Sequence, residues 1–279
     1  MKTLYVSDLD GTLLHSDERT SEFTNHTINT LVEQGMLFSY ATARSFHTAH
    51  KVTKGLNAKI PLIIYNGAII VDNVSGNIVL STYFKKAEIK SLIEDLGRHQ
   101  IYPIVYSFID GQEKFSFVDK LNTTGMQKFI DTRQGDKRIR RIEVCEQLCE
   151  GKCFYVTCID KKEKLQPLYE KYKDMYHCVF QEDIYLHDQW LEILPRNASK
   201  AMAAKQLKEY YHCERLIAFG DGRNDIDLFE IADEAYAVSN ADGNLKKIAT
   251  GVIGENNEDE VKDRGQTPVR VLSNAFDCI

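Results

Sequence analysis

The chain has 279 residues, of which 43% are hydrophobic and 27% charged, and its formal net charge at pH 7 is -6. This balance is typical of a globular protein in water, and the length allows two ordinary domains. The excess of acids argues against a nucleic-acid surface, which needs concentrated Lys and Arg. A small anionic ligand is still compatible with it, because one or two local cations can hold a phosphate.

No targeting or membrane-spanning segment is expected. Acids at positions 8 and 10 interrupt the apolar run that a signal peptide needs. The most apolar stretch, PLIIYNGAIIV at 61–71, is too short to cross a bilayer. Seven cysteines without a CxxC pair indicate reduced thiols rather than a disulfide framework or a zinc ribbon. We therefore expect a cytoplasmic protein that binds neither membrane nor nucleic acid.

The first part of the chain alternates strands with helices, which predicts a parallel sheet covered by helices. Short apolar runs that end in polar or turn residues indicate the strands, and apolar residues at helical spacing indicate the helices. The expected elements are a strand at 3–7, a helix closed by Gly35, a strand at 36–42, a helix at 45–55, a third strand at 61–65 and a hairpin across 71–77.

The middle of the chain has a different pattern, because its expected strands come in adjacent pairs. This predicts a mixed or antiparallel sheet with helices on one side. The expected elements are helices at 85–98, 121–131 and 161–174, strands at 101–108, 113–118 and 152–159, and paired strands within 175–187.

The parallel pattern then resumes. The expected strands lie at 190–195, 215–220 and 235–238, and the expected helices at 198–211, 223–231, 242–249 and 257–264. We therefore predict an α/β protein with a doubly wound, Rossmann-like parallel-sheet core. This core domain covers 1–82 plus 188–279, and an α+β domain at 83–187 is inserted into it.

The motif DLDGTLL at 8–14 follows the first expected strand and carries the strongest chemical signal. Ligands of open α/β sheets bind at the carboxyl ends of strands. Asp8 and Asp10 are two residues apart, so both can face one ligand, and Gly11 lets the chain turn beside them. The alternatives are an acidic surface turn and a calcium loop. The calcium loop requires Gly at the position of Leu13, so this alternative fails.

A second acidic motif, GDGRND at 220–225, also follows an apolar strand. Asp221 and Asp225 bring the number of acids at strand ends to four, and these would repel one another without a cation. Carboxylate oxygens suit Mg²⁺, which binds one or two carboxylates directly and keeps several waters. Alone, the motif could be a strand-to-helix turn with an acid in the first turn of the helix.

Two further residues are compatible with phosphate binding. Lys200 stands near the start of an expected helix, where a cation opposes the helix dipole unless an anion is bound there. Thr42 ends the strand MLFSYAT and is followed by Ala43, whose backbone amide could help to hold phosphate oxygens. A solvated surface lysine and an ordinary helix N-cap region remain the alternatives. His47 and His50 have no acid to complete a metal or catalytic set, and we interpret them as structural or surface residues.

The order of these signals, DxDGT, a strand-end Thr, Lys and GDxxND, resembles the haloacid dehalogenase (HAD) superfamily of phosphohydrolases. The insert of about a hundred residues between Thr42 and Lys200 resembles the type-two cap of the Cof-type branch, subfamily IIB. The resemblance extends to NGA at 66–68 and to AYAVSNADGNLKKIAT at 235–250, and so covers essentially the whole chain.

The resemblance implies a Mg²⁺-dependent phosphatase that acts on a small phosphorylated metabolite, such as a sugar phosphate, a flavin precursor or a vitamin phosphate. Asp8 would attack phosphorus and form an aspartyl-phosphate, and Asp10 would act as general acid and base. The other implied roles are phosphate binding by Thr42, Ala43, Lys200 and Asn224, and metal binding by Asp8, Asp10, Asp221 and Asp225.

Two departures and two alternatives accompany this interpretation. Ala43 stands where many members have glycine, which matters only if the residue needs a positive φ, and GENNEDEVKDRG at 254–265 lacks a glycine often found there. A sugar phosphomutase of the same superfamily, or a non-catalytic module that binds a phosphorylated ligand, would carry similar motifs. The intact acids and Lys200 argue against the non-catalytic module. No feature of the sequence indicates an oligomeric state.

Overall fold

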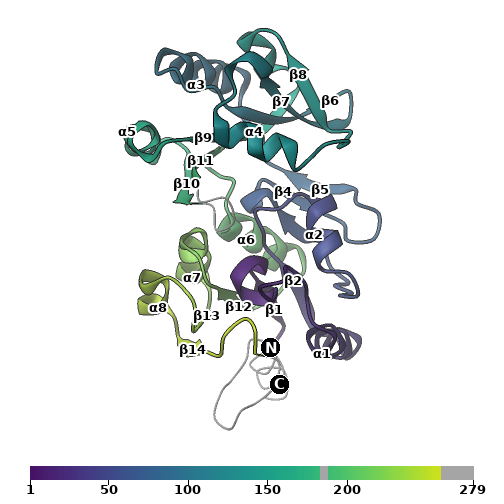
Figure 1. Ribbon diagram of the computed structural model, residues 1–279. Helices are drawn as coiled ribbons and strands as arrows, with labels where there is room; N and C mark the ends of the chain where they lie inside the picture. The colour runs from purple at the N-terminus through teal and green to yellow at the C-terminus, as the bar shows by residue number, and fades with distance from the viewer. Residues whose placement is uncertain (183–187, 259–279) are drawn as a thin grey trace. The chain divides into compact units, whose positions relative to one another are not determined.

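Residues 1–182 and 188–258 are described in a computed structural model of the protein (Figure 1). The chain divides into a first unit of Met1–Ser81 with Ala198–Ile279 and a second unit of Thr82–Asn197. In the described residues, no helix combines the length and the apolar character that crossing a membrane requires. The sequence-based division at 82/83 lies one residue from that of the structure, whereas the one at 187/188 lies ten residues before it.

The first unit is built on a five-stranded, wholly parallel sheet with the strand order β14-β13-β12-β1-β2. Apolar residues fill its central strands, and every residue of β1 is buried, which is typical of a sheet covered on both faces. The strands are β1 (Thr3–Ser7), β2 (Leu37–Tyr40), β12 (Arg215–Gly220), β13 (Glu234–Val238) and β14 (Gly251–Ile253).

Helices pack on both faces of this sheet. The chain moves from β1 to β2 in one direction along the sheet and from β12 to β13 in the other. Because such crossovers are right-handed, these opposite directions put α1 and α7 on opposite faces, and α6 and α8 pack beside α7. The helices are α1 (Glu22–Glu33), α2 (Phe46–Val52), α6 (Lys200–Tyr210), α7 (Ile226–Ile231) and α8 (Gly243–Ile248).

The strand order reverses between β1 and β12, which makes their carboxyl ends the topological switch point where α/β sheets bind ligands. Serine side chains cap the first turns of α1, α2 and α6 and fix where these helices begin. At α6, Ser199 accepts a hydrogen bond from the backbone N–H of Met202. The acidic motifs therefore follow the two strands beside the switch point.

The third expected strand, at 61–65, does not continue the parallel sheet. It forms a separate antiparallel sheet in the order β3-β4-β5, with β3 (Leu62–Ile64), β4 (Ile69–Val71) and β5 (Ile78–Ser81). One parallel bridge, between Ala41 and Ile63, links it to the end of β2. The reason is the turn Tyr65–Gly67, which reverses the chain at once and returns β4 onto β3. The expected hairpin across 71–77 is confirmed.

The second unit contains a six-stranded sheet in the order β10-β11-β9-β6-β7-β8, antiparallel except for the parallel pair β7 and β8. The strands are β6 (Ile104–Ile109), β7 (Gln112–Val118), β8 (Ile139–Ile142), β9 (Lys152–Asp160), β10 (His177–Glu182) and β11 (Gln189–Leu194). The helices are α3 (Lys86–Arg98), α4 (Thr124–Asp131) and α5 (Lys162–Tyr172). The mixed α+β character expected for this region is confirmed.

The strand expected at 190–195 belongs to this second sheet and not to the parallel core. As β11 it pairs with β10 and β9, and Leu191 lies opposite Cys158. Leu191 and Ile193 are fully buried in the same apolar cluster as α3 and α5. This cluster explains why the second unit extends to Asn197. The last part of the strands expected within 175–187, and the helix expected at 257–264 from residue 259 onward, lie outside the described residues.

The place of β11 can be tested by truncating Leu191. The change Leu191→Ala should lower the free energy of unfolding by about 2–5 kcal/mol, because it empties a fully buried site. Trp190, the one tryptophan of the chain, lies on β11 and reports this transition by fluorescence. Leu80→Ala, at a side chain that is 40% exposed, is the control and should change the value by less than about 0.5 kcal/mol. Equal effects of the two changes would contradict the assignment.

Candidate active site

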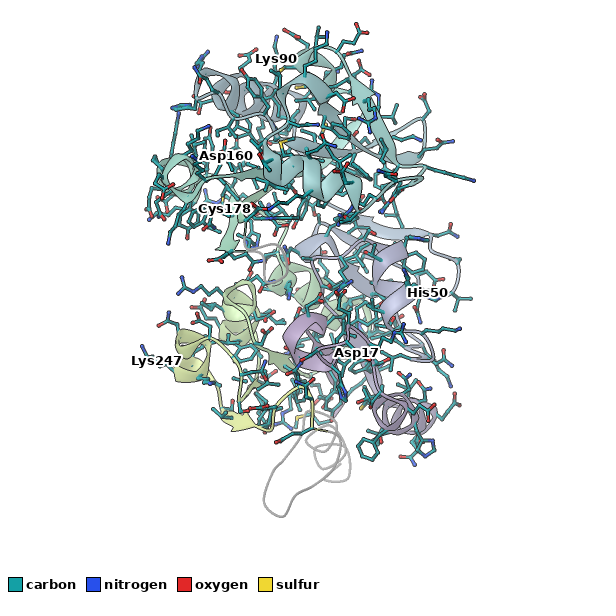
Figure 2. All side chains as sticks on the ribbon, in the orientation of Figure 1. Asp17, His50, Lys90, Asp160, Cys178 and Lys247 are labelled. Carbon is teal, nitrogen blue, oxygen red and sulfur yellow. The ribbon has the colours of Figure 1, made fainter. Side chains whose placement is uncertain are left out.

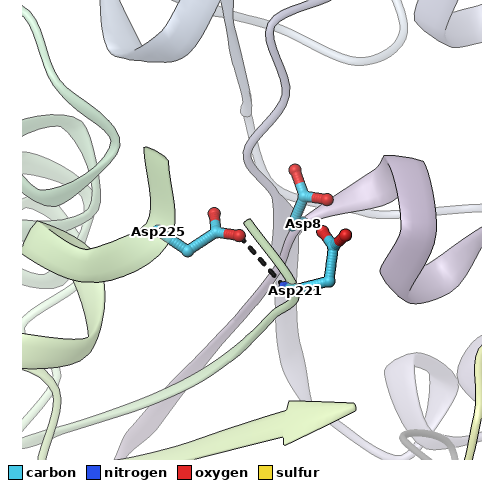
Figure 3. A group of neighbouring side chains, drawn as sticks. All are labelled: Asp8, Asp221 and Asp225. Carbon is cyan, nitrogen blue, oxygen red and sulfur yellow. Dashed lines mark hydrogen bonds between the residues drawn. The ribbon is translucent and has the colours of Figure 1, made fainter. Parts of the chain in front are cut away.

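Three carboxylates converge at the switch point of the first unit. Asp8 directly follows β1, Asp221 directly follows β12, and Asp225 lies at the start of α7. One oxygen from each lies within 4.8 Å of the others, and Figure 3 shows the three side chains turned toward one another. In the described residues, this is the only group of three or more His, Cys, Asp or Glu side chains placed to share a metal ion.

Lys200 is buried among these acids. Its Nζ lies 2.5 Å from Oδ1 of Asp8 and 2.7 Å from Oδ1 of Asp225, and its side chain is 0% exposed. Burial opposes the charge on Lys200, but the two carboxylates outweigh it and raise the pKa of the ammonium group. Lys200 therefore stays charged, and the carboxylates offset its unfavourable place in the first turn of α6.

With all of its acids ionised, the cluster would carry more negative than positive charge. Three ionised carboxylates and one ammonium group leave an excess of two negative charges. Burial, followed by the neighbouring acids, raises the pKa of Asp8 well above its ordinary value, although Lys200 acts against this. Burial and Asp225 likewise raise the pKa of Asp221 to about 7. A divalent cation would cancel the excess and let all three acids ionise.

The oxygen atoms that remain for a metal can be identified from the hydrogen bonds. Asp225 uses Oδ1 for Lys200 and accepts the backbone N–H groups of Asp221 and Gly222 on Oδ2, at 3.2 and 3.0 Å. Its contacts favour an orienting role. Among the residues that the structure describes, no side chain binds Oδ2 of Asp8, and the carboxylate of Asp221 accepts one side-chain hydrogen bond, from the Thr12 hydroxyl at 3.3 Å. Hard, adjacent carboxylate oxygens of this kind fit a divalent cation.

Gly11 is required beside Asp221. Its φ is +76°, and a Cβ atom there would lie 2.4 Å from Oδ2 of Asp221. Any other residue would displace this carboxylate or strain the backbone. The glycine of the first acidic motif thus makes room for the acid of the second.

Asp10 faces a different partner. The Arg44 guanidinium holds its carboxylate, with Nε 2.9 Å from Oδ2 and Nη2 2.5 Å from Oδ1, and also binds Glu18 at 2.8 Å. Such a fork, in which one guanidinium binds both oxygens of a carboxylate, fixes the orientation of the carboxylate as well as its position. Neither Arg44 nor Glu18 belongs to a motif from which a role was predicted. The signal available for Arg44 was a cation two residues past Thr42, at the end of a strand next to β1.

The phosphate-binding candidates lie in the same unit. Thr42 is fully buried beyond β2, and its hydroxyl accepts the backbone N–H of Arg44 at 3.1 Å. Ala43 has no positive φ, so the glycine common at this position is not needed here. Asn224 donates from Nδ2 to Oδ1 of Asn66 at 3.2 Å. Asn66, singled out before only as part of NGA, is fully buried.

Residues set aside in the sequence analysis stay away from this cluster. His47 and His50 are exposed on α2, and Figure 2 labels His50 there. Cys145, Cys149 and Cys153 are free thiols of the second unit and form no metal group among the described residues. Cys178 is a free thiol on β10, also in the second unit (Figure 2).

Known proteins resemble this chain over nearly its whole length. The family model of haloacid dehalogenase-like hydrolases matches residues 5–263. The 5-amino-6-(5-phospho-D-ribitylamino)uracil phosphatase YitU of Bacillus subtilis is 27% identical over 92% of this chain and 94% of its own. A second B. subtilis phosphatase named for the same compound, YwtE, is 27% identical over 94% of this chain and 96% of its own.

Solved structures share the fold. BT1666 of Bacteroides thetaiotaomicron, described as a phosphatase of the haloalkanoate enzyme superfamily, is 17% identical and superposes with a TM-score of 0.78 over 100% of this chain and 96% of its own. TM0651 of Thermotoga maritima is 24% identical, with a TM-score of 0.73 over 100% of this chain and 98% of its own. The chain belongs to the haloacid dehalogenase-like hydrolases. Within that family it is a phosphatase, a hydrolase of phosphoric monoesters.

Metal binding to the carboxylates can be measured without turnover. A divalent cation at a hundred times its Kd should stabilise the wild-type protein by about 2.7 kcal/mol, read as a rise in the midpoint of thermal unfolding. The change Asp221→Asn removes one available carboxylate and should abolish most of this rise. Asp17→Asn, at an exposed acid of the same unit, is the control. A rise of the same size in Asp221→Asn would place the cation elsewhere.

Proposed function

We propose that the protein is a Mg²⁺-dependent phosphatase that hydrolyses the phosphate monoester of a small metabolite through an aspartyl-phosphate on Asp8. The observation that carries the proposal is the contact between buried Lys200 and Asp8 beside Asp221, at the switch point of the sheet. Asp8 and Asp221 would hold the metal, together with the backbone carbonyl of Asp10. When bound, Mg²⁺ neutralises charge on the phosphoryl oxygens and on the carboxylates.

In the first half of the reaction, Oδ1 of Asp8, the oxygen that Lys200 contacts, attacks phosphorus, and Oδ2 is left for the metal. The bond between phosphorus and the leaving oxygen breaks, and Asp10 gives a proton to that oxygen so that an alcohol departs. Lys200, Thr42 and the backbone N–H of Ala43 would bind the phosphoryl oxygens. Because phosphoryl transfer needs little covalent help beyond the nucleophile, placing these charges is the main task of the protein.

In the second half, water attacks the phosphorus of the aspartyl-phosphate and Asp10 removes a proton from it. The bond between phosphorus and the Asp8 oxygen then breaks, which releases inorganic phosphate and restores the carboxylate. The Arg44 guanidinium would orient the Asp10 carboxylate for the second of the two proton transfers, in which Asp10 acts as base. Asn224 and Asp225 would orient the groups around the metal and phosphate.

For the substrate, we propose a phosphorylated metabolite of the size of a sugar phosphate, a vitamin phosphate or a flavin precursor. The name of the B. subtilis relatives supports 5-amino-6-(5-phospho-D-ribitylamino)uracil as the first compound to assay. The second unit would act as the cap that selects among such compounds. The phosphatase names of these relatives also favour hydrolysis over transfer to a second sugar hydroxyl.

The nucleophile can be tested with p-nitrophenyl phosphate and Mg²⁺. The change Asp8→Asn should lower kcat by at least about 10⁴-fold, because the amide cannot form the phosphoryl intermediate. Asp174→Asn, at an exposed acid of the second unit, should leave kcat unchanged. Circular dichroism should show both variants folded. Substantial turnover by a folded Asp8→Asn protein would refute the assignment.

The role of Asp10 can be tested by varying the leaving group. In Asp10→Asn, kcat/KM for a sugar phosphate should fall by about 10²–10⁴-fold, since an alkoxide departs slowly without a general acid. The loss for p-nitrophenyl phosphate should be much smaller, because nitrophenolate leaves without a proton. The ratio kcat/KM reports the steps up to departure of the leaving group and so excludes the later base step. Equal losses on the two substrates would show that Asp10 is not the acid.

A further inference from the structure

The turn between β3 and β4 has an unusual backbone. Three consecutive residues have a positive φ, namely Tyr65 at 52°, Asn66 at 49° and Gly67 at 92°. The left-handed region costs an L-residue other than glycine roughly 1–2 kcal/mol. Asn tolerates it better than most residues, whereas a bulky Tyr does not. Backbone strain of this kind persists only where the surrounding structure holds it in place.

The turn is held by the loop that follows β2. The backbone N–H of Tyr65 donates to the carbonyl of Arg44 at 3.1 Å, and that of Asn66 donates to the carbonyl of Thr42 at 2.9 Å. These are the residues proposed to bind phosphate and to hold Asp10. The position of the loop after β2 is therefore tied to the left-handed conformation of the turn.

The same turn packs against the start of α6. A Cβ atom on Gly67 would lie 2.0 Å from the carbonyl oxygen of Ser199 and 2.8 Å from the backbone nitrogen of Lys200. Both neighbours are backbone atoms, so they cannot move aside as a flexible side chain could. Gly67 thus sets how closely the turn approaches the residue whose ammonium group binds Asp8.

A third contact reaches the second acidic motif. Asn224 donates from Nδ2 to Oδ1 of Asn66 at 3.2 Å, and Asn66 is fully buried. The turn therefore contacts segments at 42–44, 199–200 and 224, which are far apart in sequence and all belong to the first unit. Each contact ends on, or next to, a residue assigned to phosphoryl transfer.

We propose that Asn66 and Gly67 are positioning residues for phosphoryl transfer, and that the turn Tyr65–Gly67 sets the places of Thr42, Lys200 and Asn224 together. The inference rests on the proposed function. Neither residue touches the reacting atoms. Asn66 acts through its amide on Asn224 and through its backbone on Thr42, and Gly67 acts by letting the turn lie against the start of α6.

The change Asn66→Gly removes the side-chain amide and keeps the backbone conformation, so it distinguishes the role of the amide from that of the turn. Glycine adopts a positive φ without strain, so the turn should keep its conformation and the midpoint of thermal unfolding should stay close to that of the wild type. Loss of the amide should lower kcat/KM for p-nitrophenyl phosphate by about 10–100-fold, as is usual when a residue that orients an active group is removed. Full activity of Asn66→Gly would overturn the proposal, since the only role of Asn66 would then be to adopt the positive φ that the turn needs.

A double-mutant cycle tests whether Asn66 acts through Asn224. If it does, combining Asn66→Gly with Asn224→Ala should lower kcat/KM no further than Asn224→Ala alone. If the loss of kcat/KM in the double variant equalled the product of the two single losses, Asn66 would not act through Asn224. If the proposed function itself were wrong, the Asp8→Asn protein would keep its turnover. The effect of a change at residue 66 could then still be measured on that turnover, so the two failures can be distinguished.

Gly67→Ala tests the approach to α6. Displacement of the turn should lower kcat by about 10²-fold. Gly35→Ala is the matched control, because Gly35 belongs to the same unit, has a φ of +107° and has no atom within 4 Å of its Cβ position. The Gly35→Ala protein has the strain of a positive φ at alanine but no close contact at the new Cβ atom, so it should keep full activity. A folded Gly67→Ala protein with wild-type kcat would overturn the role of Gly67, and Asn66→Gly decides the proposal if Gly67→Ala does not fold.

Discussion

The candidate active site depends on one buried ammonium group, that of Lys200, held between Asp8 and Asp225. Taking ions out of water costs several kcal/mol for each, and their attraction repays this only when the geometry is good and the remaining lone pairs are satisfied. Here Asp225 meets that condition, because two backbone N–H groups bind its second oxygen. The second oxygen of Asp8 is left for the metal, so the contact that stabilises the cluster would also orient the proposed nucleophile.

The topology of the sheet explains why these groups meet at all. Asp8 and Asp221 follow neighbouring parallel strands on either side of the point where the strand order reverses. Lys200 enters from α6, which packs beside α7, and the turn Tyr65–Gly67 joins the loop after β2 to the start of α6. Catalysis of phosphoryl transfer depends mainly on where the protein places its charged groups. The arrangement uses backbone contacts for that purpose, and backbone is harder to displace than side chains.

The meeting of the acids in the candidate site could be predicted from the sequence, because an apolar run that ends in an acid marks both a buried strand and its carboxyl end. That pattern located Asp8 and Asp221, and the shared edge of parallel strands implied that they meet. The same pattern could not place WLEILP, since a buried strand looks alike in either sheet and only its pairing with β9 and β10 decides. Nor could it find the Arg44 fork on Asp10 or the left-handed turn, which arise from contacts across more than 30 residues and from backbone conformation.

The central claim is that Asp8 receives a phosphoryl group beside a metal ion. A crystal structure of the protein with Mg²⁺ and beryllofluoride, which mimics a phosphoryl group on a carboxylate, tests it most directly. We expect the beryllium to be bonded to one carboxylate oxygen of Asp8, with Mg²⁺ against the other Asp8 oxygen and Asp221, and with Lys200 beside the beryllofluoride. Beryllofluoride bonded to any other residue, or Mg²⁺ bound away from these two acids, would contradict the account.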